Sequence, residues 1–127
     1  MFINKNSITI NGISMGNYLL EATYSFNKLW SSDSGRSLAG NMTGTLIGIF
    51  PKLTLHFRRL TKDELEIIVP ILDSARQTVT YYDPNKKQNV TMSTYTGDYE
   101  VSNKRIINNQ HKNEGFKCSF ISVRKRV

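Results

Sequence analysis

Short runs of alternating apolar and polar residues recur along most of this chain, whereas a helical period is clear only once. The clearest run lies in the segment 45–59, where Leu53, Leu55 and Phe57 alternate with polar neighbours. Successive side chains of a strand point to opposite faces, so this pattern predicts strands with one buried face. Pro51 has no amide hydrogen and is expected at an edge, a bulge or a break between strands.

The N-terminal third carries a hairpin signal followed by a longer strand. Ile8 and Ile10 alternate with Thr9, and the pair Asn11-Gly12 that follows favours a tight turn, because both residues tolerate positive φ. The run 19–26 alternates next, and we expect one buried face, formed by Leu20, Ala22, Tyr24 and Phe26.

The second half of the chain predicts further strands. Residues 78–82 and 90–95 flank a turn at 83–86 and read as a hairpin. Phe116, Cys118 and Phe120 alternate near the C-terminus. Apolar residues at Ile121 and Val123 then change phase, which predicts a bulge.

One helix is predicted over residues 61–74. Thr61 and Glu64 stand at the positions of a capping box, in which each side chain satisfies a backbone amide of the other residue. Leu60 and Leu65 have the spacing of a hydrophobic staple. The apolar stripe comprises Leu65, Ile68, Val69 and Leu72. Pro70 is expected to kink the helix or end it early.

Together these elements predict one α+β domain over residues 1–127. The expected architecture is a mostly antiparallel β sandwich or split barrel of about six to eight strands with one helix. Two connections stand out: a long loop at 30–44, rich in Ser, Gly and Asn, and a polar, basic loop at 102–115. Long loops in compact domains are usually functional or flexible.

Charge and cysteine content limit the classes of protein to consider. Seventeen Lys and Arg against ten Asp and Glu give a net charge of +7, which favours an anionic partner but also serves solubility. Cys118 is the only cysteine, so no disulfide within one chain is expected, which suits a reducing compartment. We expect neither a secretory signal nor a membrane span.

Candidate catalytic groups are sparse, and we expect no enzyme, no metal site and no cofactor. His56 and His111 lack the spacing of a metal-ligand set. A triad of Ser34, His56 and Asp33 has no nucleophile-elbow sequence around Ser34. Ser34-Gly35-Arg36 with Gly40 lacks the pattern of a phosphate-binding loop, so a glycine-rich turn is the better interpretation.

The basic residues raise nucleic-acid binding as an alternative. They concentrate toward the C-terminus at Lys104, Arg105, Lys112, Lys117, Arg124, Lys125 and Arg126. Tyrosines that could stack on bases are Tyr81, Tyr82, Tyr95 and Tyr99. A basic β-barrel module for single-stranded nucleic acid therefore stays open, although cross-strand packing also explains the tyrosines.

The chain resembles a family of small tail-associated proteins from phages and prophages of Gram-positive bacteria. The resemblance covers nearly the whole chain, and its most specific part is the segment Ser31-Ser32-Asp33-Ser34-Gly35-Arg36, which follows Trp30. Further matching segments are residues 8–13, 52–55 and 60–65 and the turn at Tyr82-Asp83-Pro84. The order of elements is also similar to that of the tail-tube fold.

The resemblance implies a structural protein of the virion tail, assembled in the host cytoplasm. Proteins with the tail-tube fold form rings, usually hexamers, in which a long loop reaches a neighbouring subunit. The residues expected in this inter-subunit loop are Trp30, Ser32, Asp33, Ser34, Gly35, Arg36, Leu38, Gly40 and Met42. Expected partners are copies of the chain, other tail proteins and DNA passing through the tail, with no membrane and no small-molecule substrate. Tube lumens are usually acidic, so a charge of +7 favours a distal-tail, baseplate-hub or tail-completion role at least as much as a main tube role.

Overall fold

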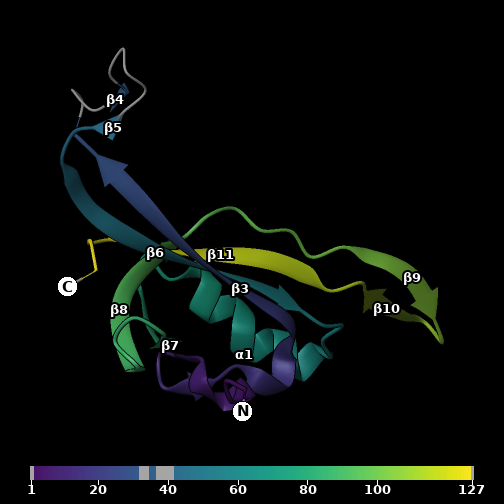
Figure 1. Ribbon diagram of the computed structural model, residues 1–127. Helices are drawn as coiled ribbons and strands as arrows, with labels where there is room; N and C mark the ends of the chain where they lie inside the picture. Colours follow the sequence, from purple (N-terminus) through teal and green to yellow (C-terminus); the bar gives the residue numbers. More distant parts are fainter. Residues whose placement is uncertain (1, 32–34, 37–41, 127) are drawn as a thin grey trace.

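The structure is a computed structural model that describes residues 2–31, 35–36 and 42–126 (Figure 1). Its helices are η1 (Lys5–Ser7) and η2 (Gly16–Tyr18), both 3₁₀, and α1 (Lys62–Asp73). The strands of the main sheet are β1 (Thr9–Ile10), β2 (Ile13–Ser14), β3 (Leu19–Trp30), β6 (Leu46–Phe57), β7 (Gln77–Asp83), β8 (Gln88–Thr96) and β11 (Phe116–Ser122). Two short ribbons pair β4 (Gly35–Arg36) with β5 (Met42–Thr43) and β9 (Asn103–Ile107) with β10 (Gln110–Asn113).

The main sheet is antiparallel, with the strand order β2-β1-β7-β8-β11-β6-β3. With α1 it makes an α+β fold, so this part of the sequence prediction is confirmed. The last strand in the chain, β11, lies at the centre of the sheet between β8 and β6. The seven strands form a single sheet and not two stacked ones, because α1 takes the place of a second layer.

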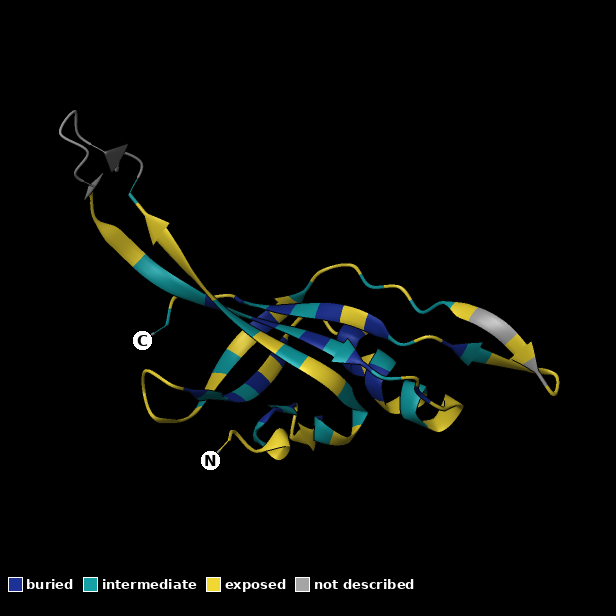
Figure 2. Ribbon diagram, turned by 45° about the vertical axis from the view of Figure 1, so that its right-hand side comes forward, coloured by how far each residue is buried: buried dark blue, intermediate teal, exposed yellow. Residues whose placement is uncertain are grey.

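The hydrophobic core lies between one face of the sheet and α1 (Figure 2). The alternation predicted for β6 is confirmed, since Leu53, Leu55 and Phe57 are all buried. On β11, Phe116 and Phe120 face the same way, and the Phe116 ring stacks on Phe57 with 4.9 Å between centroids. The helix contributes Ile68, Ile71 and Leu72 to this core.

The N-terminus of α1 is fixed as the sequence predicts. The Thr61 hydroxyl accepts a hydrogen bond from the Glu64 amide at 3.3 Å, and the Glu64 carboxylate accepts one from the Thr61 amide at 3.1 Å. Pro70 lies inside the helix, which continues to Asp73. The ladder between β6 and β11 reaches only to Lys52, so Pro51 lies where the pairing on that side ends.

Two predictions about strand faces are wrong. In β3 the register shifts between Leu19 and Glu21, and this irregularity turns Leu20 outward, where it is 68% exposed. In β11 no bulge forms, because its register with β6 runs unbroken from Phe116 to Ile121 and Ser122 takes the next buried position.

The polar segment 102–115 was predicted to be a loop, but it forms the β9–β10 hairpin. Ile107 pairs with Gln110, so Asn108 and Asn109 make a two-residue turn, with φ of 52° and 60°. Asparagine tolerates this left-handed backbone better than most residues, which allows a tight turn without glycine. The hairpin projects from one end of the molecule (Figure 1).

Candidate assembly surfaces

The distal parts of β3 and β6, residues 26–30 and 46–50, form an arm that extends past the core (Figure 2). The two strands stay paired as far as Trp30 and Leu46. Large apolar side chains along the arm are exposed: Phe26 36%, Leu29 47%, Trp30 38%, Leu46 39% and Ile47 46%. Apolar side chains gathered on a projecting element are typical of a surface that another protein covers.

The arm carries the described part of the predicted inter-subunit loop. Trp30 is the last residue of β3, and beyond it the Ser31 amide donates a hydrogen bond to the Thr45 carbonyl at 2.8 Å. Gly35 and Arg36 pair with Thr43 and Met42 as the β4–β5 ribbon. The remaining predicted loop residues, Ser32, Asp33, Ser34, Leu38 and Gly40, lie outside the described residues.

The outer edge of β3 is a second candidate surface. β3 is the last strand of the main sheet, and no described strand pairs with its outer edge. β3 is twelve residues long, and the backbone donors and acceptors of alternate residues face this free edge, where they can template pairing with another chain.

The sheet face opposite the core is polar. Register places Glu21 beside His56 and His56 beside Lys117, and Lys52 lies further along β6. The Thr54 and Ser119 hydroxyl oxygens lie 3.2 Å apart on this face. The charged residues in this central part are two lysines and one glutamate, so the face is not acidic.

The basic residues predicted to form one patch do not gather at one place. Lys104 and Arg105 belong to β9, at the end of the molecule opposite the C-terminus, and their side chains lie outside the described part (Figure 1). Lys117 is exposed on the sheet face opposite the core. Arg124 and Lys125 are exposed in the segment that follows β11.

Arg126 is a structural residue. Its guanidinium lies 3.5 Å from the carboxylate of Asp83 and 5.3 Å from the centre of the Phe26 ring. The Asp83 side chain is fully buried, and the Arg126 side chain is only 16% exposed. The sequence signals a charge run here, but it gives no sign that one of the charges is paired inside the protein.

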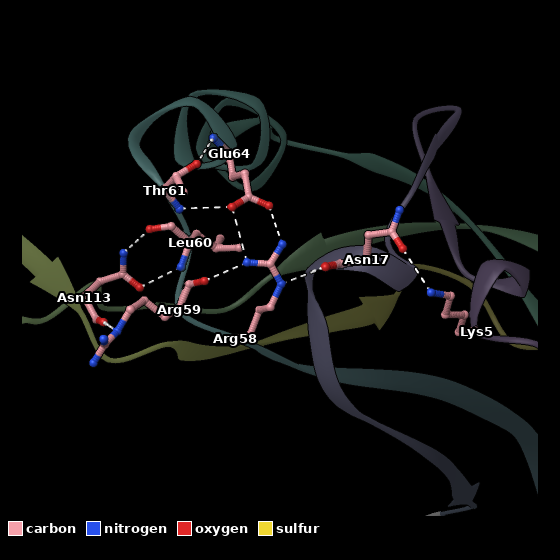
Figure 3. Close-up of polar contacts among 8 residues, drawn as sticks. All are labelled: Lys5, Asn17, Arg58, Arg59, Leu60, Thr61, Glu64 and Asn113. Carbon is pink, nitrogen blue, oxygen red and sulfur yellow. Dashed lines mark hydrogen bonds and ion pairs between the residues drawn. The ribbon is translucent and has the colours of Figure 1, made fainter.

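A polar network joins the start of α1 to the end of β6 (Figure 3). Arg58 donates to both carboxylate oxygens of Glu64, at 3.2 and 2.5 Å, and its Nε donates to the Asn17 carbonyl at 2.8 Å. The hydrogen bond from Arg58, followed by that from the Thr61 amide, lowers the pKa of Glu64 below its ordinary value. Three separate segments are thus tied together by one guanidinium.

Asn113 ties the projecting hairpin to the body and was missed by the sequence analysis. Asn113 is 3% exposed, and its side chain accepts a hydrogen bond from the Leu60 amide at 3.0 Å and donates one to the Leu60 carbonyl. Its carbonyl accepts from Arg59 Nε at 2.8 Å (Figure 3). Its Oδ1 also accepts from the Gly115 amide. One more Asn in a polar stretch carries no pattern that would mark it as buried.

A groove of about 1130 Å³ separates α1 from the hairpin that Asn113 anchors. Leu65 and Val69 line it from the helix, and His111 and Lys112 line it from β10. His56 belongs to β6 and lies on the polar sheet face, so the two histidines belong to different surfaces. Within the described ranges, no cluster of three or more His, Cys, Asp or Glu side chains could hold a metal ion.

In the part of the chain that the structure describes, no helix combines the length and apolar character needed to cross a membrane. No protein-family model matches the chain, and a search of curated proteins gives no significant match.

Proposed function

We propose that this protein is a structural subunit of a phage tail that acts by assembling into a ring with copies of itself and by contacting other tail proteins. The observation that carries the proposal is the arm, whose exposed apolar side chains lie on a paired β ribbon beyond the core. Such side chains are stabilised when a second subunit removes them from water.

Two further features support assembly. The unpaired edge of β3 runs along the arm and offers backbone hydrogen bonds to a neighbour. The arm also leads into the segment 30–44, whose sequence carries the resemblance to phage tail proteins. A contact between an arm and a different surface of the next copy is heterologous, and such contacts close into rings when the rotation permits.

The charge of the polar sheet face favours one version of this role. A channel that passes DNA is expected to be acidic, whereas Lys52 and Lys117 on this face outnumber Glu21. A distal-tail, baseplate-hub or tail-completion subunit is therefore favoured over a main tube subunit.

The role of the arm in assembly is tested by measuring the mass of the protein in solution. We expect wild-type protein to form a defined oligomer of ring size in light scattering and native mass spectrometry. Leu29→Glu combined with Ile47→Glu should give a folded monomer, because charges on the two most exposed apolar positions of the arm oppose its burial. Ile67→Glu is a control that places one new charge on an equally exposed apolar position, since Ile67 is 42% exposed on α1, away from the arm, and this variant should keep the wild-type mass. A strictly monomeric wild-type protein that is missing from purified virions would refute the proposal.

A further inference from the structure

The main sheet opens into a notch between β8 and the arm. β8 pairs with β7 along residues 88–94 but with β11 only at Thr94, Tyr95 and Thr96. The segment that follows β11, residues 123–126, then crosses toward β6, where the Arg126 amide donates to the Ile49 carbonyl at 2.6 Å. Both ribbon views place the C-terminus between β8 and the arm (Figures 1 and 2). The cavity that results has a volume of about 540 Å³.

One wall of the notch is an open strand edge. The Val123 amide donates to the Ser93 carbonyl at 2.9 Å, so the backbone groups of Ser93 point away from β7 and toward the notch. Backbone groups alternate along a strand, and those of Thr91 and Asn89 therefore point the same way. Within the described residues, no strand pairs with this side of β8 before Thr94. The backbone donors and acceptors of Asn89 and Thr91 are thus available, whereas the Ser93 carbonyl is already taken by Val123.

Four cationic side chains line the notch around this edge: Arg76, Lys86, Arg124 and Lys125. None of the four belongs to an ion pair with any described residue. Arg126, the fifth cation, is paired with Asp83 at the base. The notch therefore presents four cations without an ion-pair partner among the described residues, beside an open strand edge.

The floor of the notch is apolar, with Pro51, Val90 and Met92 among its lining residues. Tyr81 also lines it, and burial, together with the carboxylate of Asp83, raises the pKa of Tyr81 to about 12. The tyrosine hydroxyl thus stays neutral at physiological pH. An occupant would meet backbone groups on one side, cations around the rim and an apolar surface beneath.

We propose that the notch binds an extended acidic segment of a partner protein, which adds as a strand to the open edge of β8 while its carboxylates pair with the four unpaired cations. Strand addition gives affinity through main-chain hydrogen bonds, and side-chain pockets give selectivity. A nucleic acid would satisfy the charges but not the alternating donors and acceptors of β8. Nucleic acid is also usually held by exposed aromatic rings, whereas Tyr81 is 2% exposed. This inference does not rest on ring formation, because the notch lies within one subunit.

The test uses a defined probe, a fluorescein-labelled seven-residue peptide of alternating Glu and Thr, with binding followed by fluorescence anisotropy. We expect binding at about 20 mM salt that weakens at about 300 mM salt, as charge pairing requires. Arg124→Glu combined with Lys125→Glu should weaken binding at least about tenfold. The matched control, Lys62→Glu with Lys117→Glu, makes the same change in net charge away from the notch and should bind within about twofold of wild type.

Strand addition is separated from simple charge attraction by a second peptide. N-methylation of alternate Glu-Thr amides keeps every carboxylate but removes the donors that face β8, and it should weaken binding at least about fivefold. Equal binding of the two peptides, or tighter binding of an oligothymidine of equal charge, would overturn the proposal in favour of a general polyanion site. No binding of the Glu-Thr peptide at low salt would overturn it outright. Ring formation is read from the mass in solution and peptide binding from anisotropy, so a failure of the ring proposal would be seen separately.

Discussion

At the scale of single residues, the buried carboxylate of Asp83 depends on one guanidinium. Arg126→Ala should lower the free energy of unfolding by about 2–4 kcal/mol, because it leaves a buried charge without its partner and removes the contact with Phe26. Arg124→Ala is the control and should change stability by less than about 0.5 kcal/mol, since Arg124 is exposed and unpaired in the described structure.

Urea denaturation measures the stability of Arg126→Ala, of Asp83→Asn and of the double variant that combines the two. Asp83→Asn keeps the acceptor for the Asn85 amide, which bonds to Asp83 Oδ1 at 2.8 Å, while it removes the charge. The double variant should therefore lose less stability than the sum of the two single losses. Additive losses would show that the interaction between Arg126 and Asp83 does not contribute to stability.

Glu64 gives stability a dependence on pH. Its pKa is lowered in the folded state, first by the hydrogen bond from Arg58, so the stabilisation is fully present above the ordinary carboxyl value of 4.5 and is lost as pH falls through the lowered value. Glu64→Gln should cost about 1 kcal/mol at pH 7, the upper end for an accessible pair, because the Arg58 contact is bidentate.

Urea denaturation at a series of pH values checks this effect. The difference between wild type and Glu64→Gln should stay constant from neutral pH to about 5 and shrink below 4.5. Glu66→Gln is the control, because its pair with Lys62 is exposed and spans 3.7 Å, and it should change stability by less than about 0.5 kcal/mol. A difference for Glu64→Gln that does not change with pH would assign its effect to packing.

At the scale of elements, Asn113 fixes the β9–β10 hairpin to the residue before α1. Asn113→Ala should lower the free energy of unfolding by about 2–3 kcal/mol, because the Leu60 amide and carbonyl lose their buried partner. Hydrogen exchange should show the Leu60 amide losing protection in the same variant. His111→Ala removes an exposed side chain from the same hairpin and should leave both measurements near wild type.

The elements that the sequence predicts well are those with purely local causes. The capping box at Thr61 and Glu64 and the turn at Asn11-Gly12 formed as expected, since each is complete within a few residues. Leu20 faces outward because of an irregularity in its pairing with a distant strand. Alternation within one strand carries no information about such a shift.

At the scale of the whole molecule, the candidate surfaces depend on contacts between distant segments, and this limits prediction. The run Arg124-Lys125-Arg126 reads as one basic patch, yet its last member pairs with Asp83, which lies 43 residues earlier. The notch exists because β11 pairs with only part of β8. The sequence indicates cations and strands, but only the arrangement in space shows which cations stay unpaired and which edge stays open.

The central place of β11 also governs when the fold can form during synthesis. β6 and β8 emerge from the ribosome first, but the strand that joins them is the last to be made. Until residues 116–122 are free of the exit tunnel, the two halves of the sheet have no ladder between them and their apolar faces stay accessible to chaperones. The long-range pairing of β11 also implies slow folding, because the chain loses the entropy of closing a long loop before the stabilising contacts of β11 can form. The main sheet therefore cannot be completed before β11 has been made, and any assembly that needs the complete sheet follows that step.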